Sequence, residues 1–265
     1  MFLANLERIM AQIRPADIVL EIGGWAQPFR RANFIMDVFP YETRGWYSTI
    51  GLPACVGEGE EHFTKDTWIE RDACSRDPFP FEDKSIDYVI CSHILEDVRD
   101  PLWVCSEMIR VGKRGYIEVP SRVAESIVNP KTRIVGAFHH RWLVTIGSNG
   151  IAFEMKYHLI HKKGLHLPHY VLGLLRPEQG VQWLFWEGSF EFEEATIPLG
   201  EEDIEQRLRD FVKANAPTVP ITYRLFWRSR QLLSPLKSLV PKPLAEKIAG
   251  PWRYLKSMSI GTTRL

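Results

Sequence analysis

The sequence predicts an α/β fold in which parallel strands and helices alternate to form a doubly wound sheet of about seven strands. Short apolar runs at 18–22, 34–37, 86–91 and 115–120 are typical of buried parallel strands. Residues 101–111, between the last two runs, have apolar side chains at helical spacing. This order of strand, helix and strand implies βαβ units with right-handed crossovers, and hence a Rossmann-like domain.

Further strands are expected outside these units. Residues 67–72 alternate in polarity and favour a strand between the second and third runs. Residues 142–146 and 151–155 flank Ser-Asn-Gly, a sequence that favours a tight turn, and therefore predict a β-hairpin. Residues 181–186 and 190–197 flank Glu-Gly-Ser, and we expect them to form a second hairpin.

The pattern also suggests how the chain is divided. We expect one domain over residues 1–215. Its ligand-binding half would be residues 1–121, and added hairpins would lie within 122–200. Residues 201–214 predict a helix. The last 50 residues hold six prolines between short helical stretches, so we expect 216–265 to form a helical appendage.

Composition places the chain among soluble globular proteins, with 45% hydrophobic and 25% charged residues. No apolar run approaches the roughly 20 residues that are needed to cross a bilayer. Residues 1–14 mix charged and apolar side chains, which favours an amphipathic helix over a secretory signal. The four cysteines share no Cys-x-x-Cys spacing, so we expect reduced thiols and a cytoplasmic location.

Charge is unevenly distributed, although the formal net charge is zero. Residues 218–265 contain nine Lys and Arg residues against a single acid, Glu246, so the rest of the chain is acidic. Such a basic segment can contact the protein's own acidic face, a membrane surface, an anionic partner or a second subunit of a homodimer. Nucleic acid is not an expected partner, because the basic residues are peripheral and the core is acidic.

Polar residues follow the predicted strands in an order that suggests a nucleotide-like ligand. The first strand ends in the turn Gly23-Gly24, and ligands of doubly wound sheets bind at such strand ends. Asp37 ends the second strand, where a carboxylate can accept both hydroxyls of a ribose. Asp72 and Ala73 end the third, where an acid can bind an adenine amino group.

The segment that follows is the most specific one. Residues 77–98 read DPFPFEDKSIDYVICSHILEDV and are followed by RDPLW and, at 107–111, by EMIRV. This block resembles the class I S-adenosylmethionine-dependent methyltransferases, and most of all the subgroup called type 11. The resemblance covers residues 18–121. The turn GGWAQPFRRAN at 23–33 resembles a variant common among methyltransferases of glycan and cell-envelope pathways.

The resemblance implies S-adenosylmethionine as the cofactor. It also implies which residues would contact the amino-acid end, the ribose, the adenine and the sulfonium of this cofactor. In chain order, these are Glu21, Gly23, Gly24, Trp25, Asp37, Asp72, Ala73, Cys91, Ser92 and His93. The sequence departs from the family pattern at Trp25 and Gln27, which stand where glycines are usual. Only 14 residues separate Gly23 from Asp37, so the first helix must be very short. Asp97 stands where the family has a histidine.

Methyl transfer to a hydroxyl needs a base, and histidine is the best candidate. We expect His140, His139 or Asp97 to deprotonate the acceptor, because the two histidines lie in a loop after the fourth strand. A divalent cation such as Mg²⁺ is an open alternative that no ligand spacing supports. The histidines at 158, 161, 166 and 169 are expected to cap turns or bind the backbone.

Aromatic residues suggest the class of acceptor. The residues expected to contact it are Tyr47, Glu118, Arg141, Trp142 and Trp186. An aromatic-lined groove suits a saccharide or a glycolipid-like metabolite, so O-methylation of such a small or oligomeric acceptor is the first hypothesis. The alternatives are N- or O-methylation of a phenolic or polyketide-type molecule, and a non-catalytic protein that keeps the fold.

Overall fold

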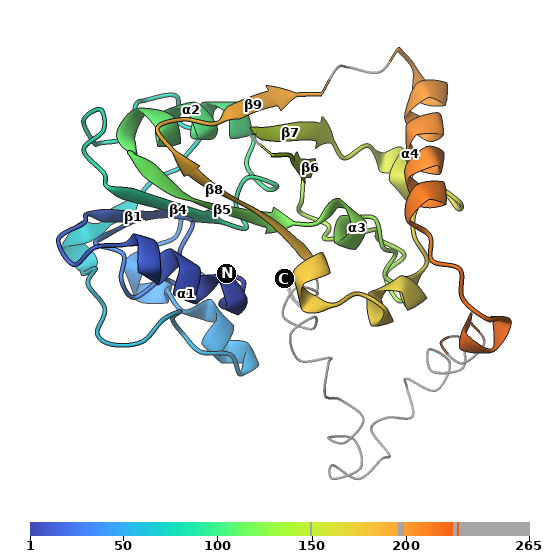
Figure 1. The fold of residues 1–265 in the computed structure, drawn as a ribbon, viewed down its shortest axis with the longest axis horizontal. Coiled ribbons are helices and arrows are strands. Elements are labelled where there is room, and N and C mark those ends of the chain that lie inside the picture. The colour runs from blue at the N-terminus through green and yellow to red at the C-terminus, as the bar shows by residue number, and fades with distance from the viewer. Residues whose placement is uncertain (149, 196–198, 225–226, 228–265) are drawn as a thin grey trace, which may run out of the picture. The chain divides into compact units, whose positions relative to one another are not determined.

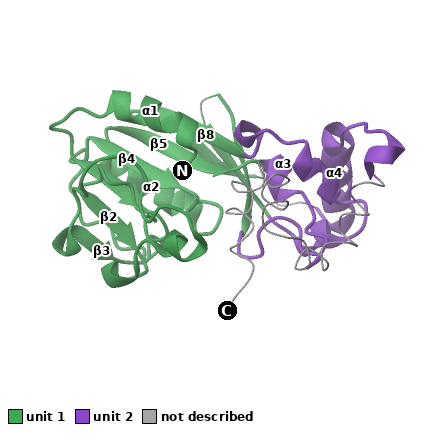
Figure 2. Ribbon diagram, turned by 90° about the horizontal axis from the view of Figure 1, so that it is seen from below, with its two compact units in different colours: residues 1–121, 141–155, 181–196 green, residues 122–140, 156–180, 197–265 purple. Residues whose placement is uncertain are grey.

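The computed structural model describes residues 1–148, 150–195, 199–224 and 227. The chain divides into two compact units (Figure 2). Unit 1 comprises Met1–Ser121, Arg141–Met155 and Val181–Thr196, and unit 2 comprises Arg122–His140, Lys156–Gly180 and Ile197–Leu265. The predicted domain boundaries at 121, 200 and 215 stay a prediction.

A mixed sheet of six strands forms the centre of unit 1, with the order β3-β2-β1-β4-β5-β8. Its parallel strands are β1 (Val19–Ile22), β2 (Phe34–Asp37), β3 (Trp68–Glu70), β4 (Tyr88–Ser92) and β5 (Arg114–Pro120). The α/β class and the five predicted parallel strands are confirmed. Among the described residues the sheet has six strands, where the sequence suggested about seven.

Helices cover both faces of this sheet, as the term doubly wound requires. α1 (Leu3–Gln12) packs through Ile9 against one face, and α2 (Pro101–Val111) packs through Val104 and Met108 against the other. Figure 1 shows the two helices on opposite sides of the strands. Since both faces are buried, the strands read as nearly continuous apolar runs, which is why the sequence revealed them.

The connection from β1 to β2 contains no α-helix, so the very short helix expected there is wrong. The segment after Gly24 instead runs alongside the 43–62 segment. Gly45 N donates to Trp25 O at 2.8 Å, and Val56 N donates to Pro28 O at 2.9 Å. Since the backbone of this segment finds its partners outside a helix, the glycines that the family uses to begin one are not needed at 25 and 27.

The first predicted hairpin is confirmed, and the second is wrong. β6 (Trp142–Ile146) and β7 (Gly150–Met155) pair in antiparallel register. β8 (Val181–Glu187) instead pairs antiparallel with β5, and β9 (Glu191–Glu194) pairs parallel with β7. β8 is apolar on both faces, with Leu184 and Trp186 in one core and Trp183 and Phe185 against the other, so the central sheet buries it better than an isolated hairpin would.

Unit 2 holds α3 (Arg122–Glu125), α4 (Glu201–Asn215) and short 3-10 turns at His158–His161, His169–Gly173 and Pro177–Gln179. Its small apolar cluster is built on Ile127, Leu167 and Val171. The helix predicted at 201–214 is confirmed. Most of the predicted appendage at 216–265 lies outside the described residues. None of the helices in the described ranges is long and apolar enough to span a membrane.

Candidate functional site

The turn after β1 is shaped by contacts within the protein. Gly23 has φ of +79°, and a Cβ added to it would lie 1.9 Å from Cδ1 of Ile94. A Cβ on Gly24 would lie 2.5 Å from Oε2 of Glu21. Both positions therefore require glycine, the first for its left-handed backbone and the close approach of Ile94, the second for the buried carboxyl below it.

Glu21 is buried beneath this turn, where its Oε2 accepts a hydrogen bond from Phe29 N at 2.8 Å. Burial raises the pKa of Glu21 to about 7, since the hydrogen bond from Phe29 offsets only part of the lost hydration. The side chain thus holds the loop in place. The structure gives it a supporting position under the predicted methionine end of the cofactor.

Asp37 occupies the carboxyl end of β2 and organises the neighbouring loop. Its two carboxylate oxygens accept hydrogen bonds from Trp25 N at 2.9 Å and Phe39 N at 3.0 Å. Burial raises the pKa of this carboxyl, and the backbone donors lower it in part. The ring of Trp25 stacks on Phe39, with 4.2 Å between centroids, and also on Trp46. Trp25, which departs from the glycine pattern, therefore forms an aromatic wall beside the predicted ribose carboxylate.

Asp72 follows β3 and remains largely accessible. Its Oδ2 lies 2.8 Å from Nη2 of Arg99, and its Oδ1 accepts a hydrogen bond from Cys74 N at 2.8 Å. Next to this segment, unit 1 has an open cavity of about 520 Å³. It is lined by Cys74, Arg76, Arg99, Asp100, Pro101, Leu102, Trp142 and Glu194. The cavity brings the predicted adenine-side segment next to the predicted substrate residue Trp142.

Cys91 and Ser92 end β4, and His93 follows it. Cys91 is fully buried, and burial raises the pKa of its thiol far above the ordinary value. His93 lies between two carboxylates, with Nε2 at 2.9 Å from Glu118 Oε1 and Nδ1 at 3.4 Å from Glu96 Oε1. Burial lowers the pKa of His93, but Glu118 and Glu96 outweigh it and raise the value to about 9. His93 is therefore an imidazolium at neutral pH.

Glu118, predicted to contact the acceptor, is fully buried and anchors the N-terminal segment. Its Oε2 accepts hydrogen bonds from Phe2 N at 2.8 Å and from the Tyr116 hydroxyl. Burial would raise the pKa of this carboxyl, but the amino terminus, His93 and Tyr116 hold it well below its usual range. The ionised carboxylate of Glu118 thus connects β5 with the end of β4 and with the chain segment before α1.

The other predicted acceptor residues differ in exposure. Trp186 lies in the hydrophobic core, 5.3 Å from the Phe190 ring centroid. Trp142 is buried and donates through Nε1 to Val98 O at 2.9 Å. Tyr47 is half-buried, and burial together with the charges of Glu96 and Asp97 raises its pKa. Arg141 is exposed. Of these four predicted acceptor residues, only Tyr47 and Arg141 therefore present polar groups near the surface of unit 1.

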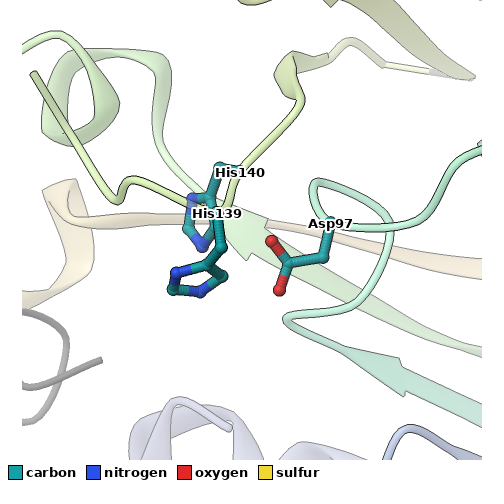
Figure 3. A group of neighbouring side chains, drawn as sticks. All are labelled: Asp97, His139 and His140. Atoms are coloured by element: carbon teal, nitrogen blue, oxygen red, sulfur yellow. The ribbon is translucent and has the colours of Figure 1, made fainter. Parts of the chain in front are cut away.

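Figure 3 shows the three residues predicted to be catalytic: Asp97 of unit 1, and His139 and His140 of unit 2. Asp97 follows β4 in a turn that its backbone N closes by donating to Ile94 O at 2.9 Å. His139 is exposed, and its ring lies edge-on to that of His140, with 4.6 Å between centroids. Nδ1 of His140 lies 2.9 Å from Oε1 of Glu125.

Glu125 and its second partner, Lys156, were missed by reasoning from the sequence. No spacing links them to His140: Glu125 ends a short helix, and Lys156 follows β7. His161, in contrast, follows its expectation, because its Nδ1 accepts a hydrogen bond from the backbone of Val135 at 3.2 Å.

Comparison with known families and structures identifies the central segment. Residues 55–117 match the model of a methyltransferase domain. The predicted resemblance to the class I S-adenosylmethionine-dependent methyltransferases is confirmed. The matched part includes all of β3, β4 and α2 and the first half of β5. No curated protein matches the chain.

Several solved structures are similar over part of the chain. A putative methyltransferase bound to the Trm112 methyltransferase activator of Haloferax volcanii is 16% identical, with a TM-score of 0.32; the match covers 45% of this chain and 53% of that one. A putative methyltransferase of Bacillus halodurans is 16% identical, with a TM-score of 0.30, and coverages of 45% and 51%. An S-adenosylmethionine-dependent methyltransferase from Methanosarcina mazei is 18% identical, with a TM-score of 0.30, and coverages of 43% and 57%. The chain therefore spans little more than half the length of these structures.

S-adenosylmethionine is the cofactor expected for this family, and the polar groups at the strand ends fit it in part. Carboxylate oxygens of Asp37 and Asp72 are acceptors suited to ribose hydroxyls and an adenine amino group. At the methionine end, the Ile94 side chain occupies the position that a Cβ atom of residue 23 would take. The donor set thus suits the nucleoside end, where Asp37, Asp72 and Ala73 would hold it.

Proposed function

We propose that this protein is an S-adenosylmethionine-dependent O-methyltransferase acting on a hydroxyl of a small or oligomeric acceptor, a saccharide or a glycolipid-like metabolite. The observation that carries the methyltransferase part is the domain match over residues 55–117. The carboxylates of Asp37, at the end of β2, and of Asp72, after β3, support binding of the nucleoside. A histidine held by a carboxylate, His140 with Glu125, supports a reaction that needs a base.

In this proposal the cofactor supplies an activated methyl group for an in-line displacement. Asp37 accepts hydrogen bonds from the ribose hydroxyls, and Asp72 accepts one from the adenine amino group. His140 takes the proton of the acceptor hydroxyl, so that oxygen attacks as its O–H bond breaks. Tyr47 and Arg141, together with Trp142 at the cavity of unit 1, orient the acceptor.

Calorimetric titration with S-adenosylmethionine tests the first step. Binding in the micromolar range is expected. The absence of binding heat at millimolar cofactor would contradict every hypothesis in which the protein is an enzyme. Release of S-adenosylhomocysteine is then compared between saccharide and phenol acceptors. Turnover with saccharides supports the proposal, whereas turnover with phenols alone favours the alternative phenolic or polyketide-type substrate. His140→Ala should keep the cofactor affinity and lose about 10²- to 10⁴-fold in turnover; His158→Ala is the matched control.

A non-catalytic role is the second candidate, and the contact between Ile94 and Gly23 favours it. If Ile94 closes the methionine end permanently, the protein binds adenosine through Asp37 and Asp72 without binding the full cofactor. Titration with adenosine and with S-adenosylmethionine distinguishes these cases. Tighter binding of the full cofactor excludes the non-catalytic role.

We further propose that turnover requires no divalent cation, which retention of activity after treatment with a chelator supports and loss of activity contradicts. The four free cysteines, all buried, support a cytoplasmic location. For the basic residues at 218–265, membrane contact and homodimer formation are separate proposals. Vesicle sedimentation with anionic lipids tests the first, and light scattering tests the second.

A further inference from the structure

Unit 2 contains a buried carboxylate whose two oxygens have separate partners. Oε1 of Glu125 lies 2.9 Å from Nδ1 of His140, and Oε2 lies 2.9 Å from Nζ of Lys156. The side chains of Glu125, His140 and Lys156 are 8%, 10% and 5% exposed, respectively. Three ionisable side chains at this depth are costly to bury, so each contact matters for holding the others in place.

The backbone around the pair is shaped to admit it. Gly136 has φ of +63°, and a Cβ there would lie 2.4 Å from Glu125 Oε2 and 2.8 Å from Lys156 Nζ. Nζ of Lys156 also donates to Ala137 O at 2.7 Å. The segment leading to His140 is therefore wrapped closely around the carboxylate, and a side chain at 136 would force it away.

Charge keeps the carboxylate in one form. Burial by itself would raise the pKa of Glu125, but the charges and hydrogen bonds of His140 and Lys156 lower it to about 2. Glu125 is therefore ionised over the whole physiological pH range. An ionised carboxylate can only accept hydrogen bonds.

This restriction decides the tautomer of the histidine. Nδ1 of His140 lies 2.9 Å from an ionised oxygen of Glu125, where a proton on Nδ1 is attracted and a lone pair is repelled, so in the neutral ring Nε2 holds the lone pair. A base of this kind needs its proton-accepting nitrogen fixed, because the other tautomer would present N–H to the acceptor. Lys156 in turn fixes the plane of the carboxylate through the second oxygen.

We propose that Glu125 is a positioning residue that holds His140 in the Nδ1-protonated tautomer and leaves Nε2 to accept the hydroxyl proton, with Lys156 fixing the carboxylate. The inference rests on the proposed role of His140 as the base. In the transfer step, the acceptor O–H bond would break, its proton would go to Nε2, and its electron pair would form the new O–CH₃ bond. The S–CH₃ bond of the cofactor would break at the same time, with its electron pair going to sulfur and S-adenosylhomocysteine leaving. The proton on Nδ1 stays in place.

Long-range ¹H–¹⁵N correlation spectra of the ¹⁵N-histidine-labelled full chain test the tautomer without depending on activity. His140→Ala identifies the His140 signals by their loss. At a pH where the ring is neutral, His140 is expected to have a protonated Nδ1. His161 serves as an internal reference of the opposite kind, because its Nδ1 accepts a hydrogen bond from Val135 N and its proton must reside on Nε2.

Glu125→Leu should move His140 toward the Nε2-protonated form, whereas Glu125→Gln keeps Nδ1 protonated, because an amide oxygen can still accept that hydrogen bond. Glu107→Gln, which alters a buried carboxyl paired with Arg110, should leave the His140 signals unchanged. If Glu125→Leu fails to fold, Lys156→Met provides the test, with a mixture of tautomers expected. An unchanged tautomer in the folded Glu125→Leu or Lys156→Met variant overturns the proposal.

Kinetics separate this inference from the proposed function. Glu125→Leu should lower kcat by about 10- to 100-fold, with the KM for the acceptor and the cofactor affinity nearly unchanged, and Glu125→Gln should recover part of the loss. Full turnover in His140→Ala would remove the proposed base, while the tautomer result would still stand or fall by the spectra. Full turnover in Glu125→Leu, with turnover lost in His140→Ala, overturns the positioning role alone.

Discussion

His93 Nε2 lies 2.9 Å from Glu118 Oε1, and this contact joins the end of β4 to the neighbouring strand β5. A second carboxylate, Glu96, approaches the other nitrogen of the same ring at 3.4 Å. The family resemblance alone suggests that residues after β4 line the cofactor pocket. The structure adds that His93 is a charged, doubly held residue, so it is unsuited to act as a base.

This arrangement makes stability depend on pH. The pKa of His93 in the folded protein is about 9, above its ordinary value of 6.5, so its stabilising effect is complete below pH 6.5 and is lost as pH rises through 9. We expect the free energy of unfolding to fall by about 2 kcal/mol more between pH 6.5 and 9.5 in the native protein than in His93→Gln. Urea denaturation measures both. His62→Gln, at an exposed histidine, is the control, and equal slopes for His93→Gln and the native protein would contradict the prediction.

Glu21 should also make stability fall with rising pH, in a lower pH range. Burial raises its folded pKa from 4.5 to about 7, so the folded protein loses stability as pH rises from 4.5 to 7. Glu21→Gln keeps an acceptor for Phe29 N but carries no charge. It should stabilise the protein by about 1 to 3 kcal/mol at pH 8 and change little at pH 4. Thermal unfolding at both values checks this, with the exposed Glu70→Gln as the control. A gain that is the same at both pH values would show that charge is not its cause.

Gly23 offers a test of the close contact with Ile94. Gly51 has a similar φ, +83° against +79°, but a Cβ there would meet nothing within 4 Å. Gly51→Ala should therefore cost about 1 kcal/mol from backbone strain alone, and Gly23→Ala about 2 to 4 kcal/mol, because the methyl group also collides with Ile94. The difference should shrink when Gly23→Ala is combined with Ile94→Ala. Equal costs for the two single variants in urea denaturation would mean that the contact is unimportant.

Asp37 should govern the affinity for the cofactor. Replacement by Asn removes the charge and one of the acceptor positions, and loss of such hydrogen bonds should weaken S-adenosylmethionine binding by about 10- to 100-fold. Calorimetric titration gives the value, and thermal unfolding of the same variant separates loss of binding from loss of the Trp25 and Phe39 contacts. Asp66→Asn, at an exposed acid just before β3, is the matched control. An Asp37→Asn variant that binds as tightly as the control is incompatible with the assigned role.

The sequence was informative where structure follows from local pattern. β1 and β4 are buried on both faces and read as apolar runs, and Pro101 with helical spacing marked α2. The same reasoning misassigned β8, because an apolar strand beside a turn does not reveal whether its partner is the next strand or β5. That choice depends on which open sheet edge buries more apolar surface, a property of the assembled unit.

For the candidate site, the sequence by itself determined the α/β class, the order of acidic residues Asp37 and Asp72 at the strand ends, and the family of the central segment. Tertiary structure alone decided that Ile94 packs on Gly23, that Glu118 holds Phe2 across 116 residues, and that Glu125 lies between His140 and Lys156. The physical reason is range. Periodicity and turn chemistry act over a few neighbouring residues, whereas buried ion pairs and side-chain packing exist only after distant segments have come together.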